Sequence, residues 1–188
     1  MALTPTWLVH AVLPGSVANG PGRRFVIWSQ GCTLGCAGCF NPDTHPLAPA
    51  AQSLSPQDVL HLVLAERASL EGVTLTGGEP LEQPEAVADF GRRLKAHSDL
   101  GIILLTGFTR TEIESDPARA AAVASVDLVV AGRYVAARRL ASGLRGSTNK
   151  AYWFRTDRYT VADLTAVPEV EIQIGVDGSL VLTGMMPT

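Results

Sequence analysis

The sequence predicts an α/β fold, a partial and open (β/α) barrel of mostly parallel strands that ends in a C-terminal antiparallel hairpin. Apolar, β-branched runs alternate with segments of helical spacing. Four of these runs are almost continuously hydrophobic, as expected of strands covered on both faces of a parallel sheet. The chain has 188 residues, whereas an eight-stranded barrel typically takes about 250. We therefore expect one domain over residues 1–188, with a sheet that stays open.

Five strands are expected in chain order, each a short run rich in strand-forming residues. The runs are Phe25–Ser29, Val73–Thr76, Ile102–Thr106, Val126–Val130 and Val170–Ile174. The last run begins the segment VEIQIGVDGSLVLTG, in which Asp177-Gly178 is a strong hairpin signal. We expect this hairpin to add antiparallel strands at an edge of the sheet. Residues 132–160 have an irregular pattern and are expected to be mostly loop.

Helices are expected between the strands. The first begins after an N-cap at Ser55, with Pro56 in the first helical position. The second begins at Pro84, and the third, which is rich in alanine, begins at Asp116 and Pro117. The apolar positions are Val59, Leu62 and Val63 in the first helix, and Val87, Phe90 and Leu94 in the second. The alternation of strand and helix indicates right-handed βα connections.

Charge and composition exclude several classes of partner. The net charge is −3, so the whole molecule offers no general attraction to nucleic acid or anionic lipid, and neither is expected as a partner. No apolar run is long enough to cross a bilayer, and the first residues do not resemble a secretory signal. The three cysteines lie in one loop, which argues against a disulfide framework and for the reducing cytoplasm.

A basic segment extends from Arg133 to Arg158, with Asp157 as its sole acidic residue. Its positive residues are Arg133, Arg138, Arg139, Arg145, Lys150, Arg155 and Arg158. Two interpretations stay open for this segment. It is either a solvated surface loop or a docking face for an acidic redox partner or an anionic substrate.

The cysteines have the spacing C-x3-C-x2-C, at Cys32, Cys36 and Cys39, directly after the first expected strand. Three thiolates can hold a metal centre but cannot complete a four-cysteine shell, so one metal position is left open. A [4Fe–4S] cluster with one iron not bound by cysteine fits this spacing. Two alternatives stay open: a Cys3His zinc site with His45 as the fourth ligand, and a set of redox-active or buried thiols.

A second motif, TGGEP at residues 76–80, follows the second expected strand. In a parallel sheet this position is the carboxyl end of the strand, where ligands bind. Gly77 and Gly78 would allow close approach to the backbone, and Glu79 could accept a hydrogen bond from a ligand ammonium group. On its own such a motif also fits a tight strand-to-helix turn.

Together the two motifs resemble the radical S-adenosylmethionine superfamily. Further stretches, among them WSQGC, TGFT, DLVVAGRY and GSTNK, are similar to the small activating proteins of anaerobic ribonucleotide reductases and to other glycyl-radical-enzyme activases. Many superfamily members have an aromatic residue where this chain has Gly38. Ribonucleotide reductase activases tend to have an acidic residue in place of Ala131 and a glutamine in place of Lys150.

The resemblance implies a set of cofactor contacts. Cys32, Cys36 and Cys39 would hold a [4Fe–4S] cluster, and the amino and carboxylate groups of S-adenosylmethionine would chelate the remaining iron. Gly77, Gly78 and Glu79 would contact the methionine amino group, while Gly38 and Phe40 would lie against the adenosine. Thr106 and Asn149 are the other candidate contacts.

The resemblance also implies a reaction. A flavodoxin- or ferredoxin-type donor would reduce the cluster, and cleavage of S-adenosylmethionine would give a 5′-deoxyadenosyl radical. By analogy with the activases, that radical would take a hydrogen atom from a glycine of a partner glycyl-radical enzyme. An enzyme that acts on a small molecule or a peptide in a biosynthetic pathway is the alternative. The alternative that is not an enzyme is a non-catalytic Cys3His zinc-binding scaffold.

Overall fold

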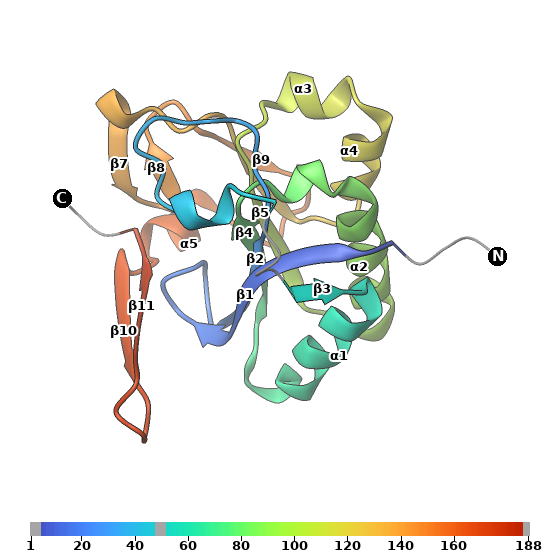
Figure 1. Ribbon diagram of the computed structural model, residues 1–188, viewed down its shortest axis with the longest axis vertical. Coiled ribbons are helices and arrows are strands. Elements are labelled where there is room, and N and C mark those ends of the chain that lie inside the picture. Colours follow the sequence, from blue (N-terminus) through green and yellow to red (C-terminus); the bar gives the residue numbers. More distant parts are fainter. Residues whose placement is uncertain (1–4, 48–51, 186–188) are drawn as a thin grey trace.

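The computed structural model describes residues 5–47 and 52–185. Its centre is a seven-stranded sheet with the strand order β3-β1-β2-β4-β5-β6-β9 (Figure 1). The strands are β1 (Trp7–Ser16), β2 (Arg24–Ser29), β3 (Gln52–Leu54), β4 (Gly72–Gly77), β5 (Gly101–Leu105), β6 (Leu128–Ala131) and β9 (Ala151–Phe154). β2, β4, β5 and β6 are parallel neighbours, as predicted, and the pairs at both edges are antiparallel. The sheet is open between its edges β3 and β9.

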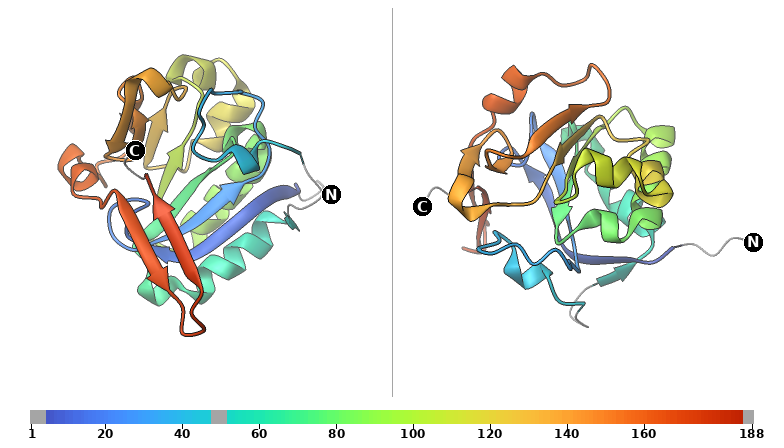
Figure 2. Two further views of the ribbon diagram at one scale, coloured as in Figure 1. Left: turned by 60° about the vertical axis from the view of Figure 1, so that its left-hand side comes forward. Right: turned by 90° about the horizontal axis from the view of Figure 1, so that it is seen from above.

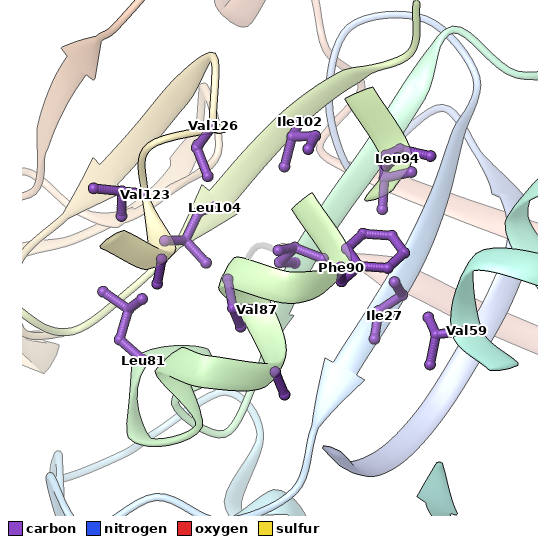
Figure 3. Close-up of a cluster of buried hydrophobic side chains, with 14 of the residues drawn as sticks. Ile27, Val59, Leu81, Val87, Phe90, Leu94, Ile102, Leu104, Val123 and Val126 are labelled. Atoms are coloured by element: carbon purple, nitrogen blue, oxygen red, sulfur yellow. The ribbon is translucent and has the colours of Figure 1, made fainter. Parts of the chain in front are cut away.

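One face of the sheet is covered by helices. They are α1 (Pro56–Ala65), α2 (Pro84–His97), α3 (Arg110–Glu114) and α4 (Pro117–Ala122), all on the same side of the sheet in Figure 1. Val87, Phe90 and Leu94 of α2 pack in the main apolar core with residues of β2 and β5 (Figure 3). This arrangement confirms the apolar face predicted for α2. Short 3₁₀ helices are η1 (Pro42–Thr44), η2 (Arg67–Ser69), η3 (Pro80–Glu82) and η4 (Ala136–Arg138).

The first helix, α1, begins at the predicted residue, but the residues on its buried face differ from those predicted. Ser55 is the N-cap of α1 and forms a reciprocal capping box with Asp58. Leu62 was expected in the core, but 43% of it is exposed, so that prediction is wrong. Leu60 is buried instead, because the face that α1 turns toward the sheet holds residues 59, 60 and 63.

The opposite face of the sheet carries a smaller apolar cluster. Its buried members are Ile103, Leu128, Val130, Leu144, Tyr159 and Leu164. Part of the cover comes from β7 (Arg139–Ser142), β8 (Arg145–Ser147) and α5 (Val161–Thr165), which lie across the sheet from α1 and α2 (Figure 2). Residues 132–160 thus hold three short strands, β7, β8 and β9, that the sequence pattern does not predict.

The C-terminal hairpin, β10 (Val170–Ile174) and β11 (Leu180–Gly184), is antiparallel as predicted. However, it forms a two-stranded sheet of its own and does not extend the main sheet, so the expected addition at a sheet edge is wrong. Its polar side holds it to the molecule. The Glu171 carboxylate accepts hydrogen bonds from the Ser16 hydroxyl at 2.6 Å and from the Val17 amide at 2.9 Å. Gln173 donates to the Gly15 carbonyl at 2.6 Å.

The other side of the hairpin is apolar and largely exposed. In the strand register Ile172 lies opposite Leu182, and Ile174 lies opposite Leu180. Directly opposed residues share one face of an antiparallel pair, so these four side chains form one aliphatic row. Each is more than half exposed, and Ile174 is 74% exposed. The hairpin therefore has the reverse of the usual alternation, with polar residues inward and apolar residues outward.

A buried arginine joins the strands at the far end from their carboxyl termini. Arg24, the first residue of β2, has no exposed surface. Its five N–H groups reach five acceptors: the Thr74 and Tyr159 hydroxyls and the carbonyls of Pro21, Val73 and Gly101. Burial lowers the pKa of this guanidinium from its usual value, partly offset by Tyr159. One cation thus links β2, β4 and β5.

Candidate functional site

A cavity of about 680 Å³ lies at the carboxyl ends of the parallel strands. The loop after β2, the turn after β4 and the residues after β5 all contribute to its wall, together with β11. All three cysteines line it, as do Phe40, Gly77, Gly78, Glu79 and Thr106. The structure therefore brings the two predicted motifs to one cavity, as expected for residues that follow neighbouring parallel strands.

Backbone hydrogen bonds hold the cysteine loop closed on itself. The Gly31 amide donates to the Thr44 carbonyl at 2.7 Å, and the Cys32 amide donates to the His45 carbonyl at 3.1 Å. All three thiols are partly exposed. Burial raises the pKa of the Cys32 thiol to about 11, and the nearby carboxylates of Glu79 and Glu82 act in the same direction. A positively charged metal centre would counteract this effect, because coordination favours the thiolate.

The glycines of the TGGEP turn are needed for close packing against the cysteine loop. Gly77 has a φ of +103°, and a Cβ there would lie 2.6 Å from the Ser29 nitrogen. A Cβ on Gly78 would lie 2.3 Å from the Gly31 carbonyl oxygen. The Gly78 amide donates to the Ser29 carbonyl at 2.9 Å. The turn thus fixes the end of β2, where the cysteine loop begins.

Glu79 is a buried carboxylate, with 1% of its surface exposed. It accepts hydrogen bonds from the Thr106 hydroxyl and the Gly107 amide, both at 2.7 Å, and from the Leu81 amide at 2.9 Å. Burial raises the pKa of this carboxyl, and the three donors and Lys150 partly offset that rise. Thr106, a predicted contact, therefore orients Glu79 and also lines the cavity.

An aromatic pair forms another part of the cavity wall. The rings of Phe40 and Tyr134 pack edge to face with centroids 4.9 Å apart, and both residues line the cavity. Gly146 makes room for them, since a Cβ there would lie 2.8 Å from the Phe40 ring. Gly38 is not among the lining residues, although a Cβ on it would be 3.9 Å from Tyr134. Tyr134 was not predicted as a site residue, because only the tertiary fold brings it to Phe40.

Two neighbouring residues of the basic segment differ in their relation to the cavity. Asn149, a predicted contact, does not line it, and its amide donates to the Arg133 carbonyl at 2.9 Å. Lys150 does line it, and its ammonium donates to the carbonyls of Thr106 and Gly132. From the sequence, Lys150 was expected to be a member of the basic segment and a departure from a related subgroup, but not a residue of the site.

Much of the remaining basic segment is engaged with aromatic rings. Arg139 lies over Phe40 at 4.3 Å, Arg145 over Tyr152 at 4.9 Å and Arg155 over Trp153 at 4.5 Å from the ring centroids. Stacking of this kind holds a guanidinium flat against the surface. These arginines are thus part of a structured surface.

The geometry also bears on the zinc alternative. His45 lines the cavity, and its Nε2 atom is buried without a hydrogen-bond partner. Yet within residues 5–47 and 52–185 no group of three or more His, Cys, Asp and Glu side chains is placed to hold a single metal ion. The three thiols instead border a cavity with room for a larger group, and glycines in their loop leave that approach open.

Comparison with known proteins gives the family. The family model described as "4Fe-4S single cluster domain" matches residues 18–153, which include the cysteine loop, the TGGEP turn and Lys150. The chain belongs to the 4Fe-4S single cluster domain family. The donor set fits this name, because three cysteines on one loop are what a single cluster with one open iron needs.

Individual curated proteins and one solved structure are similar to this chain. The anaerobic ribonucleoside-triphosphate reductase-activating protein of Vibrio cholerae is 31% identical over 150 residues, which cover 75% of this chain and 94% of that protein. The pyruvate formate-lyase-activating enzyme of Listeria monocytogenes is 39% identical over 92 residues, 47% of this chain. The chain spans 37% of the length of that enzyme. The structure of QueE from Escherichia coli covers 55% of the chain with a TM-score of 0.49 and 17% identity.

No helix in the described part of the chain is both long enough and apolar enough to span a membrane.

Proposed function

We propose that residues 1–188 form a single radical S-adenosylmethionine domain, and that it activates a partner enzyme by taking a hydrogen atom from a glycine of that partner. One observation carries the proposal: the cysteine loop and the TGGEP turn border the same cavity, in a chain of the 4Fe-4S single cluster family. The choice of partner rests on the Vibrio cholerae relative, an activating protein whose match covers 94% of its own length and 75% of this chain.

In this proposal Cys32, Cys36 and Cys39 hold the cluster, and S-adenosylmethionine binds its open iron. Bound there, this pair supplies one-electron cleavage of a carbon–sulfur bond and a 5′-deoxyadenosyl radical. The electron comes from a flavodoxin- or ferredoxin-type protein. The reducing cytoplasm is the proposed setting, since it keeps the three thiols unpaired.

The other lining residues bind and orient the nucleotide. The carbonyls of Gly77 and Gly78 and the Glu79 carboxylate are the acceptors for the methionine ammonium group. Thr106 and Gly107 hold Glu79 in place through their hydrogen bonds. The rings of Phe40 and Tyr134, which pack edge to face, offer aromatic surface for the adenine. Gly38 allows the turn between Cys36 and Cys39, because its φ is +68°. Asn149 stays a candidate contact that would need to turn from the Arg133 carbonyl.

The decisive experiment follows the hydrogen atom. Cells that produce the natural partner are grown on glycine deuterated at Cα, and their dialysed protein fraction is given to the reconstituted chain with S-adenosylmethionine and dithionite under anaerobic conditions. Mass spectrometry should then detect deuterium in 5′-deoxyadenosine. The small-molecule filtrate of the same cells should transfer none. Deuterium transferred from the filtrate and not from the proteins would identify a small-molecule enzyme instead.

Replacing Gly78 by alanine is expected to displace the cysteine loop. The new Cβ would lie 2.3 Å from the Gly31 carbonyl oxygen, so the backbone next to Cys32 must move. Such overpacking costs about 1–3 kcal/mol in stability. We expect the variant to bind much less iron and sulfide on reconstitution, as measured by colorimetric analysis. Gly35→Ala is the comparison in the cysteine loop itself: a Cβ at Gly35 meets nothing within 4 Å, so its cost comes only from its φ of +61°, and we expect it to lose less iron and sulfide than Gly78→Ala. Equal loading of both variants would contradict the proposed packing role.

A further inference from the structure

Lys150 places an ammonium group at the cavity in a fixed position. Its Nζ donates to the Thr106 carbonyl at 2.9 Å and to the Gly132 carbonyl at 2.6 Å. These carbonyls follow directly after β5 and β6, so the amine is tied to the ends of two central strands. An ammonium has three N–H donors, and hydrogen bonds among the described residues use two of them. The third remains for the cavity.

The charges around this ammonium are mostly negative groups of the same site. Burial lowers the pKa of the Lys150 amine from its usual value and Arg133 acts in the same direction, while Glu79, Cys36 and Cys39 favour the charged form and partly offset that fall. Glu79 is almost fully buried, and both cysteines line the same cavity as Lys150. A lysine in this setting offsets the negative charge of a buried carboxylate and of thiolates, in a region where solvent screens charges less than at the surface.

We propose that Lys150 is the fixed cation of the cavity and raises the reduction potential of the cluster bound by the three cysteines. The inference rests on the proposed function for the identity of that cluster. Reduction adds one electron, which a flavodoxin- or ferredoxin-type donor loses, and no bond or proton moves. The reduced state carries one more negative charge, so a nearby positive charge stabilises it more than the oxidised state.

The test is a redox titration of the reconstituted protein without S-adenosylmethionine, followed by electron paramagnetic resonance. At a fixed solution potential, Lys150→Gln should lower the ratio of reduced to oxidised cluster about tenfold, a shift of about 59 mV for a one-electron couple. Lys150→Arg keeps the positive charge and should keep most of the wild-type potential. Thermal unfolding of each protein before reconstitution shows whether it is folded.

Arg155→Gln provides the matched control. It removes a positive charge from the same segment, but Arg155 lies over Trp153 and does not line the cavity. Its potential should equal that of the wild type. Glu79→Gln tests the same principle with the opposite sign and does not depend on a folded Lys150 variant. Loss of a negative charge there should raise the potential.

The outcomes separate this inference from the proposed function. If the wild-type protein takes up no iron and sulfide, the proposed function fails and the role of Lys150 fails with it. If the wild type holds a cluster whose potential is unchanged in Lys150→Gln, or if Arg155→Gln shifts it equally, only the role of Lys150 is overturned. An unchanged potential in both Glu79→Gln and Lys150→Gln would show that charged side chains at this part of the cavity do not set the potential.

Discussion

Replacing Cys36 by alanine is expected to abolish the release of 5′-deoxyadenosine by the reconstituted protein. Cys36 and the other two cysteines are the only thiols in the chain, so no other cysteine can replace the lost ligand. A cluster held by two thiolates also lacks the site geometry that leaves a single iron open. Chromatography of the reaction with dithionite and S-adenosylmethionine measures the product. The same loss is expected for Cys32→Ala and Cys39→Ala.

Thr33→Ala is the control for the cysteine substitutions, because it alters the same loop without removing a thiol. Thr33 is exposed, and its amide and hydroxyl both donate to the Glu82 carboxylate. The variant loses the hydroxyl bond and keeps the amide bond, so we expect it to retain its cluster and most of its activity. Wild-type product release from Cys36→Ala would disprove the assignment of this residue as a ligand. A stoichiometric zinc content in the wild type, with no cleavage, would support the scaffold alternative.

Replacing Arg24 by methionine is expected to give the largest loss of stability in the chain outside the site. Methionine fills a similar space, but it leaves the Thr74 and Tyr159 hydroxyls and three carbonyls without their donor. Each buried polar group left unsatisfied costs about 1–3 kcal/mol, and the groups here share one donor, so the costs do not simply add. We expect a loss of about 3–5 kcal/mol in the free energy of unfolding, measured in urea.

The neighbouring Arg23 offers the matched control for Arg24. It carries the same charge one position earlier in the chain, and it is exposed. Arg23→Met should change the free energy of unfolding by less than about 0.5 kcal/mol, as is usual for surface substitutions. If both variants were equally stable, the buried guanidinium would not hold β2, β4 and β5 together in the way its hydrogen bonds indicate.

The central strands and the two main helices could be predicted because each follows one local pattern. β2, β4, β5 and β6 are buried on both faces and read as continuous apolar runs. β1 has no such signal, because register shifts between Val9 and Ala11 and between Leu13 and Ser16 interrupt the alternation of its side chains. β9 has four residues and lies at the sheet edge, stabilised by pairing with β6, which no local pattern shows.

The candidate site likewise has one part that could be predicted from the sequence and one part that could not. The cysteine loop and the TGGEP turn could be placed together from sequence, because parallel strands end at the same edge. The contributions of Tyr134, Lys150 and β11 depend on contacts between residues far apart in the chain, such as the Lys150 ammonium with the Thr106 carbonyl. Which face of the hairpin points toward the rest of the protein could not be predicted from the sequence either. Its alternating pattern gives two faces, but only the hydrogen bonds of Glu171 show that the polar one points inward.

The exposed row of Ile172, Ile174, Leu180 and Leu182 affects how the purified chain behaves in solution. A two-stranded sheet that exposes a row of aliphatic side chains offers a surface on which other molecules can pack. A net charge of −3 gives little mutual repulsion to oppose that packing. We therefore expect self-association of the chain to increase with its concentration, which size-exclusion chromatography at several concentrations would measure.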